Sequence, residues 1–420
     1  MRLPSKRTLG LVVIPLLVPI VFLVSRRPDR PPVGVELVEL AGPLHVGVNT
    51  DSADFVSVAL RPGKLFDDRE PLQSRPVVVV AAALASLPLR PLLRIADPAS
   101  RIDTTVARRA LAPGGDADVN DAMAAYLVYI AINALLLLGS LVVFWRAVGP
   151  GPKWWALAPL ALVVAGNQVV KAFFWTPHLQ IFNILVPVVA VEAARRTLDR
   201  PLASWRQSAL VGLALGLSAL AYGAAVIIVV AVVAAQVLGR RPRRLSPLLP
   251  LVLAFAAVVG AWVVVVEAVS GGFYNHEVRV YRQFVWIVDA IRGGDIGAAV
   301  ARNLHLFIDT TIPVVWLPVA VLAVIALCSM RAPLSAGSRQ RLAGAAIGFA
   351  SAALFYAPLG LYASRLSWSL VPPVLVATGV LAQRVVDDRW RPMAWVCAVV
   401  VAVEGVGSLA AELIRRGPYG

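Results

Sequence analysis

Long apolar segments separated by short basic stretches form the main pattern of this chain. A helix needs about 17 to 25 mostly apolar residues to cross the hydrocarbon core of a bilayer. The first apolar segment covers residues 9–24, and the others cover residues 122–144, 154–170, 179–194, 210–238, 248–269, 312–328, 342–361, 370–382 and 393–410. The pattern predicts an all-α, polytopic membrane protein with about 11 transmembrane helices.

The apolar segment at residues 210–238 is long for one crossing helix and short for two. Arginine clusters stand on both sides of it, in RRTLDRPLASWR before and in GRRPRR after. Basic residues gather on the cytoplasmic side of a membrane, so both clusters satisfy this rule only if the chain crosses twice. We therefore expect a tight helical hairpin that turns near Tyr222 and Gly223.

The same charge rule predicts the orientation of the whole chain. It places the N-terminus in the cytoplasm and the C-terminus outside, in the plasma membrane, and residues 9–24 read as a retained anchor because no small-residue cleavage site follows them. Residues 1–420 then form one transmembrane domain whose two long extracytoplasmic loops cover residues 25–121 and 270–311. Most acidic residues and all four histidines fall on this outer side.

Helical spacing with few apolar residues predicts two interfacial helices in the first outer loop, at residues 51–60 and 76–93. A true crossing at residues 76–93 is the alternative. It would reverse the side of every later loop and place the arginine clusters outside.

Composition agrees with a membrane protein and excludes several soluble functions. Apolar residues make up 59% of the chain and charged residues 15%, and the mean hydropathy is +0.77. The net charge of +15 comes largely from arginines between apolar segments, so nucleic acid is not an expected partner. The sequence contains no nucleotide-binding glycine loop, no HExxH and no CxxC. GLALG, with Gly212 and Gly216, predicts close helix packing.

An aspartate on the first predicted outer helix is followed four positions later by an aromatic residue, in the run Asp51, Ser52, Ala53, Asp54, Phe55. A proline-bearing second helix follows in QSRPVVVVAAALASLPL. This arrangement resembles the GT-C glycosyltransferases, integral membrane enzymes that use polyprenyl-phosphate sugars, although the subfamily is not assigned. The resemblance covers about residues 45–386. Ser52 departs from the acidic residue often found next to the catalytic aspartate, and arginine precedes proline where two prolines are more usual.

The resemblance implies that Asp51 is the general base. Asp54 lies on the same helical face, where it would raise the pKa of Asp51 or help to hold a divalent cation. The departure at Ser52 leaves open which carboxylate binds a metal, and no cofactor is certain. The alternative for Asp51 is an N-cap without chemistry.

Candidate substrate-binding residues stand in three outer segments: Lys171 and His178 around KAFFWTPHLQ, then Tyr274, Glu277, Arg279 and Arg282, and finally Arg365 in YASRLSW. Cations in these places suit a lipid phosphate at the outer membrane boundary. The alternatives are snorkelling for Lys171 and Arg365, and a solvated amphipathic helix for the middle group.

The resemblance implies transfer of a hexosyl or pentosyl unit from a polyprenyl-phosphate donor to a glycan, lipid or protein acceptor, on the outer face of a bacterial plasma membrane. Membrane lipid is the other expected partner. Two alternatives stay open: a transporter or lipid flippase, and a non-catalytic membrane protein with this fold.

Overall fold

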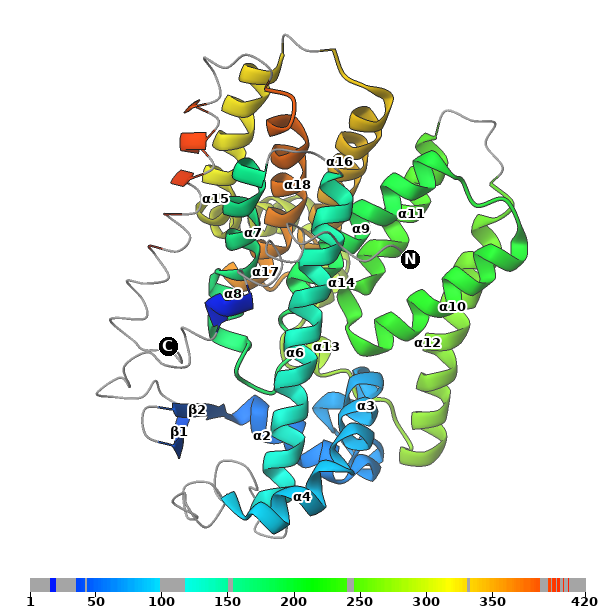
Figure 1. Cartoon of the computed structure of the whole chain (residues 1–420). Coiled ribbons are helices and arrows are strands. Elements are labelled where there is room, and N and C mark those ends of the chain that lie inside the picture. Colours follow the sequence, from blue (N-terminus) through cyan, green and yellow to red (C-terminus); the bar gives the residue numbers. More distant parts are fainter. Residues whose placement is uncertain are drawn as a thin grey trace.

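The protein is an all-α, polytopic membrane protein, as predicted. The computed structural model describes residues 16–19, 35–41, 44–98, 118–149, 154–239, 245–330, 333–385 and single positions between 392 and 407. Nearly all of these residues are helical. A short antiparallel pair, β1 (Val35–Ala41) and β2 (Leu44–Asn49), was not predicted, and it leads directly into the first helix of the outer loop (Figure 1).

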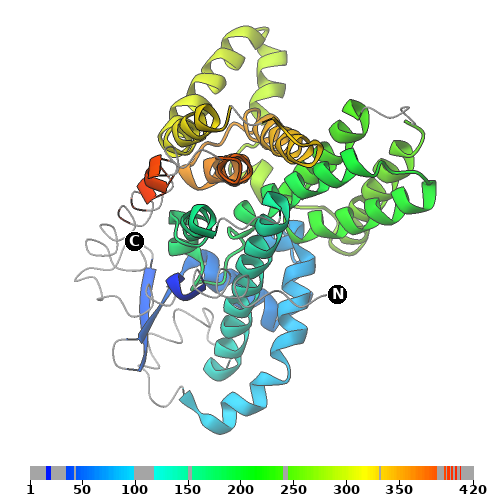
Figure 2. The same ribbon diagram turned by 45° about the horizontal axis from the view of Figure 1, so that its top comes forward.

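The segment predicted to be the first outer loop, which keeps this name below, folds into a compact group of short helices. It contains α2 (Thr50–Leu60), the 3-10 helices η1 (Pro62–Phe66) and η2 (Pro71–Ser74), α3 (Pro76–Ser86) and α4 (Leu89–Ala96). Figure 2 shows these helices gathered beside α6, at one side of the bundle. The helix expected at residues 51–60 is confirmed as α2.

The second predicted helix of this loop is broken. Pro76 occupies the first turn of α3, where its missing N–H costs nothing, and the chain bends by 52° between α3 and α4. Together the two helices are apolar enough for a broken span or a re-entrant loop. Their place at the membrane interface stays a prediction.

Four helical runs in the described part of the chain are long and apolar enough to cross a membrane. They are α6 (Val119–Val148), α12 (Leu248–Ser270), α15 (Ile296–Ser329) and Ser364–Ala382, which joins α17 (Ser364–Ser367), η5 (Trp368–Leu370) and α18 (Val371–Ala382). The bent pair would make a fifth. The predicted count of about 11 is therefore not confirmed, and the predicted segments 9–24 and 393–410 lie largely outside the described residues.

The remaining helices begin and end at other residues than the predicted apolar segments. Residues 154–170 form α7 (Trp154–Ala165) and part of α8 (Gln168–Phe173), because the Asn167 side chain caps α8 by accepting from the N–H groups of Val169 and Val170. The other helices are α9 (Phe182–Asp199), α13 (His276–Arg279), α14 (Val285–Gly293) and α16 (Ala336–Tyr356). Helix α15 begins at Ile296, within the range expected as outer loop.

The break expected near Tyr222 is present. Helix α10 (Trp205–Ala221) ends at Tyr222, whose backbone is extended, and η4 (Gly223–Ala225) leads into α11 (Val226–Leu238). The tight hairpin is wrong, however, because α10 packs mainly on α12 whereas α11 packs on α9 and α16 (Figure 1). The two helices diverge from Tyr222, which leaves this residue at the wall of the site described below.

The close helix packing predicted for GLALG is confirmed. A Cβ atom at Gly212 would lie 2.3 Å from the Leu251 carbonyl oxygen, and one at Gly216 would lie 2.7 Å from the Val258 Cβ atom. Both glycines therefore let α10 and α12 approach with their backbones nearly in contact.

We expect Gly212→Ala to destabilise the protein, because overpacking of this kind costs about 1–3 kcal/mol. Gly260→Ala in α12 is the matched control, since a Cβ atom there has nothing within 4 Å. That control should be neutral or should stabilise the helix by up to about 1 kcal/mol. Thermal midpoints of both variants in one detergent test this, and equal midpoints would contradict the packing role.

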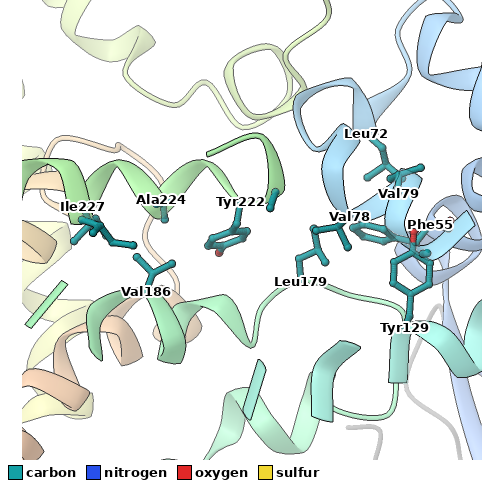
Figure 3. Packing of buried hydrophobic residues seen from close by; sticks show 14 of the residues in the cluster. Phe55, Leu72, Val78, Val79, Tyr129, Leu179, Val186, Tyr222, Ala224 and Ile227 are labelled. Atoms are coloured by element: carbon teal, nitrogen blue, oxygen red, sulfur yellow. Dashed lines mark hydrogen bonds between the residues drawn. The ribbon is translucent and has the colours of Figure 1, made fainter. Parts of the chain in front are cut away.

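The buried core ties the first outer loop to the bundle. Phe55 of α2 meets Tyr129 of α6 edge to face, with ring centroids 5.5 Å apart, and the Tyr129 hydroxyl donates to the Phe55 carbonyl oxygen at 3.3 Å (Figure 3). Leu72 and Val79 of the same loop lie in this cluster. These contacts fix α2, and with it Asp51, against α6.

Candidate functional site

Asp51 lies in the first turn of α2 and pairs with His178, which is far away in the sequence. The distance from His178 Nε2 to Asp51 Oδ2 is 3.2 Å. The Leu179 N–H donates to His178 Nδ1 at 2.9 Å, so Nδ1 is the acceptor nitrogen of a neutral ring. The proton of the neutral imidazole is then on Nε2, which donates it to the Asp51 carboxylate.

Hydrogen bonds from Asn133 of α6 hold the backbone that precedes His178. The Asn133 side-chain amide donates to three carbonyl oxygens, those of Phe173, Phe174 and Thr176. The Phe173 ring also packs against the imidazole, with centroids 4.6 Å apart. His178 itself is only 4% exposed, so its ring has little freedom to leave Asp51.

The electrostatic environment keeps Asp51 ionised. The hydrogen bond from His178 is the largest cause that lowers the pKa of Asp51, burial opposes it, and the charges of Arg365 and Arg75 lower it further. Burial is the main cause that lowers the pKa of His178, against the effect of Asp51. Near neutral pH the pair is therefore a carboxylate that accepts a hydrogen bond from a neutral imidazole.

Among the described residues, the Asp51 side chain forms a hydrogen bond with His178 and with no backbone N–H of α2, which argues against the N-cap alternative.

Asp54 lies one turn further along α2 and has a different environment. Burial and the charge of Asp51 raise its pKa, while Lys64 and His276 lower it. The two carboxylates are thus distinct, with Asp51 the more readily ionised. In the described part of the chain no three His, Cys, Asp or Glu residues are placed to hold a metal ion. A divalent cation on Asp51 and Asp54 stays a prediction.

A cavity of about 350 Å³ is lined by Arg75 and Arg365, the two cations whose charges lower the pKa of Asp51, while Asp51 and His178 are not among its lining residues. Five separate segments of the chain supply its walls: the first outer loop, the turn before α9, the break after α10, the second outer loop, and the stretch from the end of α16 to α17. The polar and charged lining residues are Ser74, Arg75, Gln180, Tyr222, Asn275, Glu277, Tyr281, Gln283, Tyr356 and Arg365.

Arg365 brings a cation to this cavity from α17. Its guanidinium carbon lies 5.8 Å from the centroid of the Phe173 ring. Its Nε atom is buried and has no hydrogen-bond partner within the residues that the structure describes. Buried donors without a protein partner are usually satisfied by a water molecule or a bound group, and Arg365 lines a cavity that has space for one.

A second cation, Arg75, lies at the start of α3 and was not predicted as a site residue. Its guanidinium forms an ion pair with Glu277 of α13 and lies 5.8 Å from the centroid of the Tyr222 ring. The only sequence signal for it was the arginine that stands where a proline is more usual.

A buried polar network supports the aromatic wall. The Asn183 Oδ1 atom accepts from the Tyr222 hydroxyl at 2.7 Å and from the Tyr356 hydroxyl at 3.1 Å. Ser369 donates to the Tyr356 hydroxyl at 3.1 Å. Sequence reasoning missed these residues because polar positions inside apolar helices carry no spacing pattern, and their convergence is tertiary.

The fold is similar to that of an archaeal oligosaccharyltransferase. The matched structure is the crystal structure of the Archaeoglobus fulgidus oligosaccharyltransferase in complex with zinc and sulfate, with a TM-score of 0.46 and 13% sequence identity. The match covers 98% of this chain and 53% of that one, so this chain spans about half the length of the matched protein. No protein-family model and no curated protein matches the sequence.

The structure brings only some of the predicted substrate-binding residues to the cavity. Glu277 and Arg365 line it, whereas the five other candidates are not among the lining residues: Lys171, His178, Tyr274, Arg279 and Arg282. His178 instead pairs with Asp51. Lys171 is 2% exposed within α8, Arg279 is exposed, and Arg282 donates to Asp289 at 2.6 Å on the surface. The Tyr274 N–H donates to Gln73 Oε1 at 2.8 Å. Their contact with a substrate stays a prediction.

Proposed function

We propose that this membrane protein transfers a sugar from a polyprenyl-phosphate donor to an acceptor on the extracytoplasmic face, with Asp51 as the general base. One observation carries the proposal: Asp51, paired with a neutral histidine, lies within electrostatic reach of Arg75 and Arg365, and both of these arginines line one cavity. A base and an anion-binding cation within reach of each other are the two groups that this reaction needs.

The chemistry assigns different tasks to Asp51 and to Arg365. In an inverting transfer, the acceptor oxygen bonds to the anomeric carbon while the bond from that carbon to the phosphate oxygen breaks. The acceptor hydroxyl becomes acidic as its oxygen bonds, so a carboxylate with a low pKa is a sufficient base for its proton. The phosphate leaves with its electron pair and gains negative charge, which Arg365 stabilises.

The walls of the cavity suit the rest of such a donor. Tyr222, Tyr281 and Phe355 line the cavity, and aromatic side chains are suited to contact with a sugar ring. The apolar helices around the cavity belong to a membrane protein, so a polyprenyl tail remains in the lipid while its phosphate reaches Arg365. The acceptor is a glycan, a lipid or a protein that reaches the Asp51 side.

The function is tested in membranes that contain the protein, supplied with sugar-labelled polyprenyl-phosphate hexoses and pentoses. We expect label in an acceptor together with one released polyprenyl phosphate for each sugar transferred, and no transfer from nucleotide sugars. Movement of intact donor across the membrane without release of polyprenyl phosphate would contradict the proposal and favour a flippase. A loss of transfer in EDTA that Mg²⁺ or Mn²⁺ restores would assign a cation to Asp51 and Asp54.

A further inference from the structure

The Arg75 and Glu277 ion pair joins the two outer loops at the wall of the cavity. Both side chains are 19% exposed, so the pair is largely removed from water. The second oxygen of Glu277 accepts from the Ser74 hydroxyl at 3.3 Å. All three residues line the cavity that also contains Arg365. The Glu277 carboxylate therefore fills an anion position that the cavity wall itself builds.

This carboxylate is chemically similar to the group that the proposed donor would bring. Carboxylates and phosphates both accept from a guanidinium fork and from a hydroxyl, and arginine binds either of them. Arg75 also stays over the Tyr222 ring, which keeps its guanidinium directed into the cavity. An incoming phosphate would thus compete with Glu277 for a cation that is already in place.

Glu277 is carried on a short segment whose other hydrogen bond to the first outer loop comes from the Tyr274 N–H, which donates to Gln73 Oε1 at 2.8 Å. Helix α13 has four residues and follows Gly271 and Gly272, where Gly271 has a φ of +76°. Beyond α13 the chain is anchored again, because the Phe284 N–H donates to the Leu359 carbonyl oxygen at 3.0 Å and Trp286 Nε1 donates to the Pro358 carbonyl oxygen at 2.9 Å.

Trp286 packs closely against the backbone at Gly360, which fixes the position of this anchor. A Cβ atom at Gly360 would lie 2.4 Å from the Trp286 ring, so this glycine is needed where the indole lies against the backbone. Backbone angles change most readily at glycine, so Gly271 and Gly272 provide a hinge on the N-terminal side of the segment that carries Glu277.

We propose that Glu277 is an internal competitor for the donor phosphate, which occupies Arg75 and Ser74 in the resting protein and is displaced when the phosphate binds. The proposal rests on the proposed function for the identity of the anion. Displacement releases the contact between the outer loops, so donor binding and movement of α13 are coupled. No covalent bond changes in this step, since one acceptor replaces another on the same donors.

Binding of farnesyl phosphate to the purified full chain in lipid nanodiscs tests this exchange. We expect Glu277→Gln, which keeps the shape but removes the charge, to bind farnesyl phosphate about tenfold more tightly than the wild type, a difference of about 1.4 kcal/mol. Farnesol, which lacks the phosphate, should bind both proteins equally. Asp289→Asn is the matched control, because it breaks the exposed ion pair with Arg282 in the same loop and should leave the affinity unchanged.

A double-mutant cycle separates competition for Arg75 from a general loss of negative charge. In an Arg75→Gln background, Glu277→Gln should give no further gain. An equal gain in that background, or unchanged or weaker binding in the Glu277→Gln single variant, would overturn the proposal. Glu277→Asp keeps the charge but shortens the side chain, so it should give a smaller gain in affinity for farnesyl phosphate. This variant replaces Glu277→Gln in the test if the glutamine variant does not fold.

These outcomes are independent of catalysis. Asp51→Asn should reduce transfer without weakening the binding of farnesyl phosphate, because the charges of Arg75 and Arg365 act on Asp51 and the loss of its negative charge does not disfavour an anion at these arginines. If no sugar is transferred, the proposed function fails while the exchange at Arg75 is still measured by binding alone.

Discussion

Replacing Asp51 by asparagine should reduce sugar transfer by about 10²–10⁴-fold, the range that a positioned general base contributes. Asparagine keeps an oxygen that can accept from His178 Nε2, so the histidine remains bound, but the amide cannot take the acceptor proton. The rate of label transfer in membranes, divided by the amount of inserted protein, measures this effect. The loss should appear in kcat, because the proton moves only as the new bond forms.

The matched control for this variant is Asp68→Asn in the same outer loop. The Asp68 side chain is 86% exposed and pairs with Arg69 on the surface, so this variant should transfer sugar at the wild-type rate. A wild-type rate in correctly inserted Asp51→Asn protein would remove Asp51 from the role of base.

The dependence of the wild-type rate on pH provides a second test of the Asp51 and His178 pair. Activity requires ionised Asp51, and the hydrogen bond from His178 lowers the pKa of this carboxyl. The rate should therefore persist on acidification to a lower pH than an ordinary aspartate, with a pKa of about 3.9, would allow. His178→Gln should move this acidic limb to higher pH, since the largest cause of the lowered pKa is weakened. A limb that does not move in the variant would show that another group controls it.

Replacing Arg365 by glutamine should lower kcat by about 10²–10³-fold, the usual loss when one donor to a developing negative charge is removed. The physical reason is that the leaving phosphate gains charge at the cavity, where the Arg365 Nε atom has no other partner among the described residues. Arg365→Lys should recover only part of this loss, because an ammonium group cannot offer a planar pair of donors. Steady-state transfer rates over a range of donor concentrations separate the effect on kcat from an effect on KM.

Arg69→Gln is the matched control for the charge itself. Its side chain is 80% exposed in the first outer loop, so a loss of positive charge there should change the rate little. Equal rates for Arg365→Gln and the wild type would mean that another cation stabilises the leaving phosphate.

The sequence alone determined the class of this protein and several local features. Apolar segments of membrane length indicated helices because a buried backbone in lipid must satisfy its own hydrogen bonds. The same local patterns located α2, the break at Tyr222 and the close packing at Gly212. They also marked His178 and Arg365 as candidates, whereas the resemblance of the run around Asp51 to a known family implied the role of this residue as base.

Helix bounds were predicted less well where polar residues continue a helix. Helix α15 begins at Ile296, although Asn303, His305 and Asp309 interrupt the apolar pattern of that region. Intrahelical hydrogen bonds form with any side chain except proline, so a hydropathy window ends before the helix does. The prediction of the outer loop therefore extended too far.

Only the tertiary structure decided which of these groups meet. Asp51 and His178 are 127 positions apart, and Arg75 and Glu277 are 202 positions apart. Periodicity reports the face of one helix, whereas such pairings depend on how several helices pack and where each one breaks. For the same reason the divergence of α10 and α11, which leaves Tyr222 at the cavity wall, could not be obtained from a pattern that is local along the chain.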